Sequence, residues 1–254
     1  MKFSKRLQGI SAFWTSIGVL LFLVSLVAFA TLLPRNHVAA VIAPPLSLLQ
    51  SQNLDLSSAG HASITVNIST SAGNLLVAWC SEGTNNTDTP RVSDSASNAW
   101  TQVGSYVSRS DNVNRAGLFY AKNAAAVTSV TCTFSTAGGI NHPRLMIWEI
   151  AGADTASPLD TSVGVNNGAS GLISTSGALT TTNANDILIL ATDVSTNQTS
   201  PFYTAGSGYT IPTNAAAVRL GMEYKITTST QSNVTASMTH TVSSLYDSIF
   251  AAFK

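Results

Sequence analysis

Apolar and polar residues alternate strictly over residues 218–226. One side of this segment carries Val218, Leu220, Met222, Tyr224 and Ile226, and the other carries Arg219, Gly221, Glu223 and Lys225. A period of two predicts a β-strand that is buried on one face and solvated on the other. The segment contains the pattern Arg-x-Gly-x-x-Tyr, which also occurs at residues 115–120. We therefore expect both segments to be middle strands in two matching halves of one β-sandwich.

Each copy of the pattern places a glycine in the middle of its predicted strand, at Gly117 and at Gly221. A glycine inside a strand lowers stability, and it often marks a place where another group approaches the backbone closely. The sequence thus predicts that some part of the protein packs directly over each of these two glycines.

The first half of the domain contains further apolar segments of strand length. Residues 74–80 are almost uniformly apolar, which predicts a central strand buried on both faces. Residues 91–94 and 99–107 flank a polar turn at 95–98, and this pattern predicts a β-hairpin. The other strands predicted in this half are residues 46–53, 63–68, 130–134 and 145–150.

The second half repeats the order of the first. Residues 185–191 match residues 74–80 at a spacing of 111, and Tyr209 occupies the place of Trp100 at a spacing of 109. The segments 234–238 and 249–253 then follow the Arg219 strand as 130–134 and 145–150 follow the Arg115 strand. Because roughly five or six strands per half are too few to close a core, we expect one shared interior.

The predicted fold is therefore all-β. We expect a single jelly-roll-type β-sandwich of about ten to twelve strands. It would occupy residues 46–254, with pseudo-repeat halves at about 46–153 and 158–254.

The N-terminal segment has a different composition. Lys2, Lys5 and Arg6 precede an uncharged, mostly apolar run that extends to Pro34. Ala28-Phe-Ala30 fits a signal-peptide cleavage site, whereas residues 10–33 are long enough to span a bilayer as an uncleaved anchor. Residues 1–33 are thus a signal peptide or a membrane anchor, and residues 34–45 are a linker. Both alternatives predict an extracytoplasmic domain, secreted or anchored to the membrane by this segment alone.

Charge excludes one class of partner for the domain. Residues 1–44 hold four basic residues and no acid, so the remainder carries 12 − 4 = 8 basic against 12 acidic residues, a net charge of −4. Nucleic-acid binding needs clustered Lys and Arg, which this composition lacks. Only 9% of the chain is charged, which favours strands joined by polar turns over surface helices.

Several of these segments resemble a widespread class of bacterial exported β-sandwich modules. The resemblance lies in the residues 73–77, 92–101, 118–121, 147–152, 158–160 and 251–253. It implies a jelly-roll or lectin-like architecture and export, for modules that mostly have no assigned activity. It brings no catalytic residues, and Cys80 and Cys132 are not part of it.

Cys80 and Cys132 are the two cysteines of the chain, and both lie in predicted strands. An even count in an exported chain favours a disulfide, with two buried thiols as the alternative. In the chain-entropy model, closing a loop of this length would stabilise the fold by about 4 kcal/mol.

The sequence assigns no catalytic residue, no metal and no cofactor. The histidines, at positions 37, 61, 142 and 240, lack zinc-site spacing, and no Gly-x-Ser-x-Gly elbow is present. Glu149 and Glu223 are the only carboxylates that suggest glycan cleavage, and an ion pair of Glu149 with Arg115 or Arg219 is the alternative. Asp94 and Asn98 frame a turn that fits a calcium ion or, equally, side-chain bonds to the turn itself.

Aromatic residues are the best candidates for ligand binding. Trp100 and Tyr209 hold equivalent places in the two halves, and Tyr106, Tyr203 and Phe119 are further candidates. An exposed ring beside Asn, Asp or Ser is suited to stacking on a sugar, whereas a core anchor beneath a loop is the alternative.

Three functions follow from these features. The leading hypothesis is a non-catalytic cell-surface module that engages glycans or other surface components. The second is a structural protein whose copies assemble by pairing the strand edge at residues 63–68. The third is a glycan-cleaving enzyme that uses Glu149.

Overall fold

The protein is all-β in the computed structural model, which describes residues 45–254 except Gly138. Thirteen strands form three antiparallel sheets, so the all-β prediction is confirmed and the strand number exceeds the expected ten to twelve. No helix in this part of the chain is long and apolar enough to cross a membrane. The predicted leader, residues 1–33, and the linker up to Pro44 lie outside the described residues.

The first sheet has the order β1-β8-β3-β6-β5. Its strands are β1 (Ser47–Asp55), β8 (Arg144–Ala151), β3 (Asn74–Glu82), β6 (Arg115–Ala124) and β5 (Thr101–Val107). The central strand β3 is buried on both faces along nearly its whole length, as its uniformly apolar sequence predicts.

The second sheet has the order β11-β13-β10-β12, and β9 also pairs with β13. Its strands are β11 (Tyr203–Thr204), β13 (Ser237–Phe253), β10 (Ile187–Val194), β12 (Leu220–Ile226) and β9 (Leu159–Thr175). The third sheet, β2-β7-β4, consists of β2 (Ser63–Asn67), β7 (Ser129–Thr133) and β4 (Arg91–Asp94). The pattern segment 115–120 therefore lies inside its sheet, but the pattern segment 219–224 lies at an edge.

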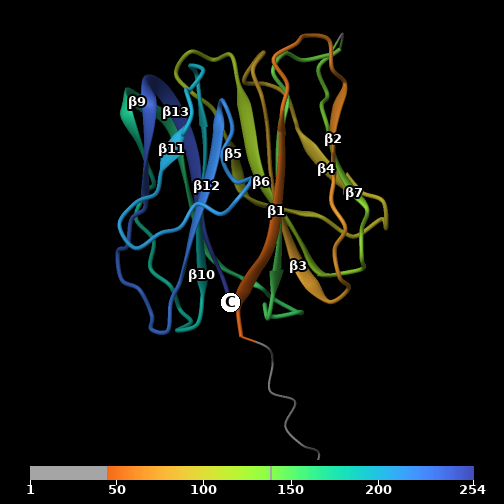
Figure 1. Cartoon of the computed structure of the whole chain (residues 1–254), viewed down its shortest axis with the longest axis vertical. Coiled ribbons are helices and arrows are strands. Elements are labelled where there is room, and N and C mark those ends of the chain that lie inside the picture. The colour runs from red at the N-terminus through yellow and green to blue at the C-terminus, as the bar shows by residue number, and fades with distance from the viewer. Residues whose placement is uncertain (1–44, 138) are drawn as a thin grey trace, which may run out of the picture. The chain divides into compact units, whose positions relative to one another are not determined.

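The three sheets pack as layers (Figure 1). An inner cluster fills the space between the two large sheets and includes Trp79, Trp148 and Phe253. A second cluster lies between the first sheet and the three-stranded sheet, and a third covers the other face of the second sheet. Each half of the domain thus has an outer cluster of its own, and the two halves share the inner cluster.

The predicted hairpin at residues 91–107 is wrong. β4 pairs with β7 in the three-stranded sheet, whereas β5 pairs with β6 in the first large sheet. The turn at 95–98 therefore carries the chain from one layer to another. The carboxylate of Asp94 holds this turn, because it accepts hydrogen bonds from the backbone N–H groups of Ala96 at 2.8 Å and Asn98 at 3.2 Å.

β9 was not predicted. It is seventeen residues long, rich in Gly, Ser and Asn, and mostly exposed or half-buried, so it lacks an apolar face. Its extended form comes from pairing with β13, which is equally long. Long-range backbone pairing of this kind leaves no periodic signal in the sequence.

The arrangement β8-β3-β6 in the first sheet corresponds to β13-β10-β12 in the second. Gly117 pairs with Cys80, and Gly221 pairs with Thr192. The pairing therefore relates β3 to β10 at a spacing of 112, one residue more than the sequence comparison gives. Because a shift of one residue moves a side chain to the other face of a sheet, residues of β3 and β10 that the sequence comparison matched point to opposite faces of their sheets.

Two aromatic pairs cross the inner cluster in a reciprocal way. Tyr120 of β6 meets Phe253 of β13 edge-on, with ring centroids 5.7 Å apart. Tyr224 of β12 meets Trp148 of β8 in the same geometry at 5.8 Å. The tyrosine of each Arg-x-Gly-x-x-Tyr segment thus contacts the final strand of the opposite half.

Both pattern glycines lie beneath aromatic rings, which confirms the prediction of a close approach. A Cβ atom at Gly117 would lie 2.9 Å from the Phe119 ring and 3.0 Å from Tyr106, and one at Gly221 would lie 3.2 Å from Tyr203. Any larger residue would push these rings away from the sheet.

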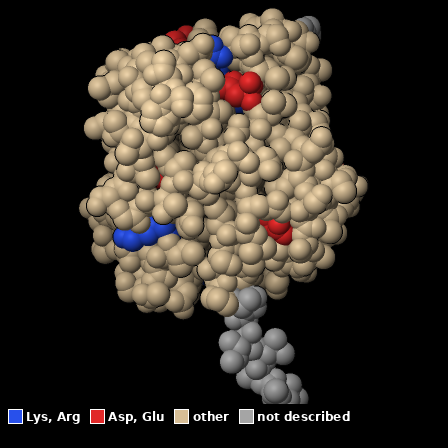
Figure 2. Space-filling model, viewed as in Figure 1, with Lys and Arg blue, Asp and Glu red and all other residues tan. Residues whose placement is uncertain are grey.

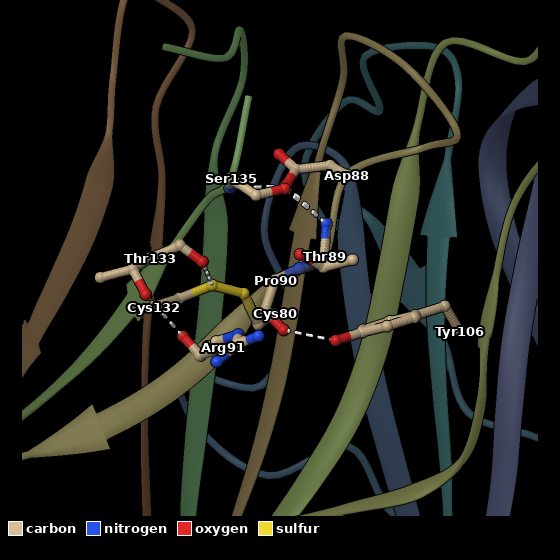
Figure 3. The surroundings of a disulfide bond; sticks show 9 residues. All are labelled: Cys80, Asp88, Thr89, Pro90, Arg91, Tyr106, Cys132, Thr133 and Ser135. Atoms are coloured by element: carbon tan, nitrogen blue, oxygen red, sulfur yellow. Dashed lines mark hydrogen bonds between the residues drawn. A yellow bond between two sulfur atoms is a disulfide. The ribbon is translucent and has the colours of Figure 1, made fainter. Parts of the chain in front are cut away.

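The disulfide Cys80–Cys132 is present and links β3 to β7, with Cα atoms 6.1 Å apart (Figure 3). It therefore ties the three-stranded sheet to the centre of the first large sheet. Nearby, the Tyr106 hydroxyl donates to the Pro90 carbonyl at 2.7 Å, and the Asp88 carboxylate accepts from the backbone N–H of Ser135 at 2.7 Å.

Replacing Cys80 and Cys132 together by alanine should lower the free energy of unfolding by about 4 kcal/mol, because the unfolded chain regains the freedom of a 52-residue loop. Urea unfolding followed by tryptophan fluorescence measures the change. Wild-type protein unfolded in the presence of a reducing agent serves as the control and should show a similar loss. Equal stability of the oxidised wild type and the double variant would contradict the prediction.

Candidate functional site

The five aromatic candidates do not form one surface. Trp100, Tyr106 and Phe119 belong to the cluster under the three-stranded sheet. Tyr203 and Tyr209 belong to the outer cluster of the second sheet. The structure thus places them in two groups, on opposite sides of the shared interior.

The aromatic side chains are occupied by contacts within the protein. Phe119 and Tyr203 are only 5% and 6% exposed. The half-buried Trp100 donates from Nε1 to Asp94 Oδ2 at 2.7 Å, and the Arg115 guanidinium lies 5.0 Å from the centre of the Tyr106 ring. Burial, and then the charge of Glu223, raise the pKa of Tyr209. Sugar stacking by these residues stays a prediction.

In the turn that was considered for calcium binding, the carboxylate of Asp94 accepts hydrogen bonds from within the protein. Asp94 Oδ1 accepts from two backbone N–H groups, and its Oδ2 accepts from Trp100. Nowhere in residues 45–137 and 139–254 do three or more His, Cys, Asp or Glu side chains gather in a way that would hold a metal ion. Calcium binding at this turn stays a prediction.

Glu149 is buried and held by neutral groups. Its Oε1 accepts from Ser71 N and Asn74 Nδ2, each at 2.7 Å, and its Oε2 accepts from Gln50 Nε2 at 2.6 Å. Arg115 instead donates to Ser108 Oγ at 3.2 Å, and no ion pair joins Glu149 to Arg115 or Arg219. The expected ion pair is wrong, because neighbouring amides supply the hydrogen bonds that this carboxylate needs.

Glu223 lies on a strand face that was expected to be solvated, but its side chain is fully buried. Its Oε2 accepts from the backbone N–H of Gly206 at 2.7 Å. Burial raises its pKa to about 7, because no cation compensates the carboxylate. The segment that contains Tyr203 and Gly206 covers this face, so neither glutamate meets solvent.

Two hollows lie along the seam between the edge strands β1 and β12, which are neighbours in Figure 1. One hollow of about 910 Å³ lies beside Leu46 and Ile226, and a second of about 380 Å³ lies beside Leu48 and Tyr224. Leu46 lies two positions from Leu48 in the chain, and Ile226 lies two positions from Tyr224. The two hollows are therefore displaced by about 7 Å along the seam. Together they form the candidate ligand site, which we call the seam groove.

The seam groove combines an apolar floor with uncommitted polar groups. Tyr224 is half-buried and lines the narrower hollow. Gln52 Oε1 accepts from Asn214 Nδ2 at 3.3 Å, which leaves the Gln52 amide nitrogen for a ligand. Asn185 is exposed at the wider hollow, and Asp154 and Lys254 supply one charge of each sign there.

The surface around the groove is poor in charge. Nine of the twenty charged residues in the domain are buried: Glu82, Asp88, Arg109, Arg144, Glu149, Asp186, Asp193, Glu223 and Asp247. Figure 2 shows that charged groups are few and scattered on the face that displays the seam. A neutral polar ligand fits this surface better than an ionic one.

From the narrower hollow onward, hydrogen bonds join β1 to the segment that precedes β12. The register of β1 against β8 shifts between Leu48 and Gln50. After the shift, Ser51 Oγ donates to the Thr213 carbonyl, and Asn53 Nδ2 donates to the Asn214 carbonyl at 2.8 Å. Asp55 then accepts from the backbone N–H of Arg219 at 2.9 Å. Ser51, Thr213 and Asn214 also line the narrower hollow, so the contacts that fasten β1 to residues 213–214 form part of its wall.

A buried charged network lies next to this closed part of the seam. Arg144 Nη1 donates to both carboxylate oxygens of Asp193, at 2.7 and 2.8 Å, and Arg109 Nη1 donates to Asp193 Oδ2 at 2.6 Å. Asn114 Nδ2 bridges Asp193 and Asp247. The sequence analysis missed this network, although aspartates inside the apolar segments 187–194 and 246–253 are a signal for it.

The chain matches no known family model, and neither a characterised protein nor a solved structure is detectably similar to it.

Replacing Glu149 by glutamine should lower the free energy of unfolding by about 2 kcal/mol, because one of its three donors would then face an NH₂ group. Urea unfolding at neutral pH measures the difference. Gln231→Ala, which removes an amide that bonds only within its own turn, is the matched control and should change stability much less. A variant as stable as wild type would contradict the account of Glu149 as a structural acceptor.

Proposed function

We propose that the protein is a non-catalytic, extracytoplasmic β-sandwich module of jelly-roll type that binds uncharged glycans in the seam groove. The observation that carries the proposal is the groove itself, which combines the Tyr224 ring with amide groups on a nearly uncharged surface. Sugar recognition uses the same combination of an apolar face and directed hydrogen bonds.

The size and position of the groove support a binding role over a catalytic one. Volumes of about 300 to 1,000 Å³ are usual for ligand sites, and both hollows lie in that range. The two glutamates considered for catalysis, Glu149 and Glu223, are buried and line neither hollow. A retaining or inverting glycosidase needs two carboxyl groups that reach the substrate.

Export is the second part of the proposal. It rests on the basic and apolar N-terminal segment, which acts as a signal peptide or as the sole membrane anchor. The disulfide between Cys80 and Cys132 is consistent with an oxidising compartment. Such a module would meet glycans or other surface components outside the cytoplasm.

Tyr224→Ala should weaken glycan binding about fivefold or more, because stacking on one ring contributes on the order of 1 kcal/mol or more. A glycan array with the full chain identifies the ligand, and calorimetry with the best oligosaccharide measures affinity. Gln52→Ala should also weaken binding, because it removes an amide of the groove.

Tyr120→Ala is the matched control for Tyr224→Ala. Tyr120 holds the same position in the other Arg-x-Gly-x-x-Tyr segment, is also half-buried, and packs on Phe253 instead of lining the groove. It should retain wild-type affinity. A blank array, or equal loss of binding in the two tyrosine variants, would contradict the proposed site.

Self-assembly is a second candidate, favoured by one exposed segment. Leu172 and Ile173 near the end of β9 are 51% and 50% exposed, although they are neighbours on opposite faces of a strand. Paired apolar residues at a strand end are suited to contact with another copy. Analytical ultracentrifugation of wild type and of Leu172→Ser/Ile173→Ser tests this, and a monomeric wild type at high concentration would remove the candidate.

A further inference from the structure

Two aspartates lie side by side in the sealed interior of the domain. Asp193 of β10 and Asp247 of β13 are directly paired in the register of the second sheet, and neither side chain has any exposed surface. Directly opposed residues in an antiparallel pair have Cα atoms about 4.5 to 5.5 Å apart. Two ionised carboxylates at such a distance, away from water, repel each other strongly.

The groups that could compensate the negative charge of a carboxylate are divided unequally between the two aspartates. Asp193 accepts from Arg109, from Arg144 and from Asn114, so both of its oxygens are paired with guanidinium groups. Asp247 Oδ2 accepts only from the neutral amide of Asn114, and its Oδ1 is buried without a partner. A buried carboxylate in this position is much less costly when it is protonated.

The charge balance of the whole network also favours a protonated Asp247. Arg109 also contacts Asp111 at 3.3 Å, and Arg144 also contacts Asp55 at 3.7 Å. Two guanidinium groups therefore face four carboxylates, which gives 2 − 4 = −2 if all are ionised. One proton on Asp247 leaves −1, and the half-buried Arg219, whose backbone holds Asp55, offsets the remainder.

Within residues 45–137 and 139–254, no further element supplies a charge to Asp247. The part of β9 opposite this region of β13 runs from Val165 to Gly168 and holds only Val, Asn, Asn and Gly. The groups that face Asp247 are thus Asp193 from β10, Arg144 from β8, and Arg109 and Asn114 from the segment between β5 and β6.

We propose that Asp193 and Asp247 form a buried proton-binding site, in which Asp247 holds one proton in the folded protein and thereby links the packing of the two large sheets to pH. The site joins β10 and β13 of the second sheet to β8 of the first. Its ligand is a proton, and binding requires no access for a larger molecule.

The sign of the coupling follows from the folded and unfolded states. Burial, and then the charge of Asp193, raise the pKa of Asp247 to about 8, against a partial opposing effect of Arg109. In the unfolded chain an aspartate titrates near pH 4, at about 3.9. The stabilising effect of the proton is therefore complete below about pH 4 and is lost progressively as the pH rises to about 8.

Urea unfolding of the full chain across this pH range tests the proposal. One proton bound only by the folded state makes the unfolding constant rise roughly tenfold per pH unit between about pH 5 and pH 7. Asp247→Asn should remove that tenfold factor from the slope. Asp154→Asn, a change at an exposed carboxylate on the surface, is the matched control and should keep it. Equal slopes for wild type and Asp247→Asn would overturn the proposal.

Carbon-13 NMR of the aspartate side-chain carboxyl groups gives a test that does not depend on the stability of a variant. Wild-type protein should show one aspartate carboxyl that titrates near pH 8. In Asp193→Asn the neighbouring charge is absent, so Asp247 should ionise at lower pH and become the partner of the two arginines. If every aspartate in the folded wild type titrates below about pH 5, the site does not hold a proton and the proposal fails.

Discussion

The packing of the two large sheets on one interior is the interaction on which the rest of this structure depends. Sheets stack about 10 Å apart, so large side chains must fill the gap from both sides. Here the gap is spanned by two edge-on aromatic contacts, Tyr120 with Phe253 and Trp148 with Tyr224. Each contact joins a strand of one half to a strand of the other, so neither half can close this interior alone. The shared interior fixes where the edge strands β1 and β12 meet.

The side-chain contacts across the seam between those edge strands differ at its two ends. At one end, the leucines of β1 face Tyr224 and Ile226, and the side chains leave a groove. At the other end, Ser51, Asn53 and Asp55 bond across the seam, and the arginine and aspartate network lies behind them. Buried charges of this kind contribute little net stability, but they tolerate only one arrangement of partners. We therefore expect the apolar contacts to supply most of the stability, while the network penalises any alignment of the sheets that leaves one of its charges without a partner.

Much of the architecture was predictable because it rests on local patterns. Period-two alternation identified β12, uniform apolarity identified the central strand β3, and the pattern glycines indicated that rings pack over Gly117 and Gly221. β9 was not predictable, since its polar sequence becomes a strand only by pairing with β13. The choice of partner for β4 was missed for the same reason. Sequence spacing suggested a hairpin, but the burial of Val92 with the cluster under the three-stranded sheet places β4 beside β7.

The candidate site was harder to derive than the fold. Trp100 and Tyr209 were chosen for their chemistry, yet an aromatic ring serves equally well as a core anchor, and only the surroundings distinguish the two roles. Tyr224 belongs to the pattern from which the fold was inferred, but its position in a groove depends on β1, which is about 170 residues earlier in the chain. Likewise, Asp193 and Asp247 become neighbours only through the register of β10 and β13.

The register shift in β1 lies beside the narrower hollow of the seam groove. Residues on both sides of the shift line this hollow, and Ser51 and Asn53 also fasten the strand to residues 213–214. Leu46 and Leu48 take no part in the fastening contacts, but both pack against the inner cluster. Leu49, which is 52% exposed, and the half-buried Gln52 also line the narrower hollow, so substitutions there would alter the hollow with less effect on the interior. The same positions are the natural starting point for laboratory selection of new binding specificities.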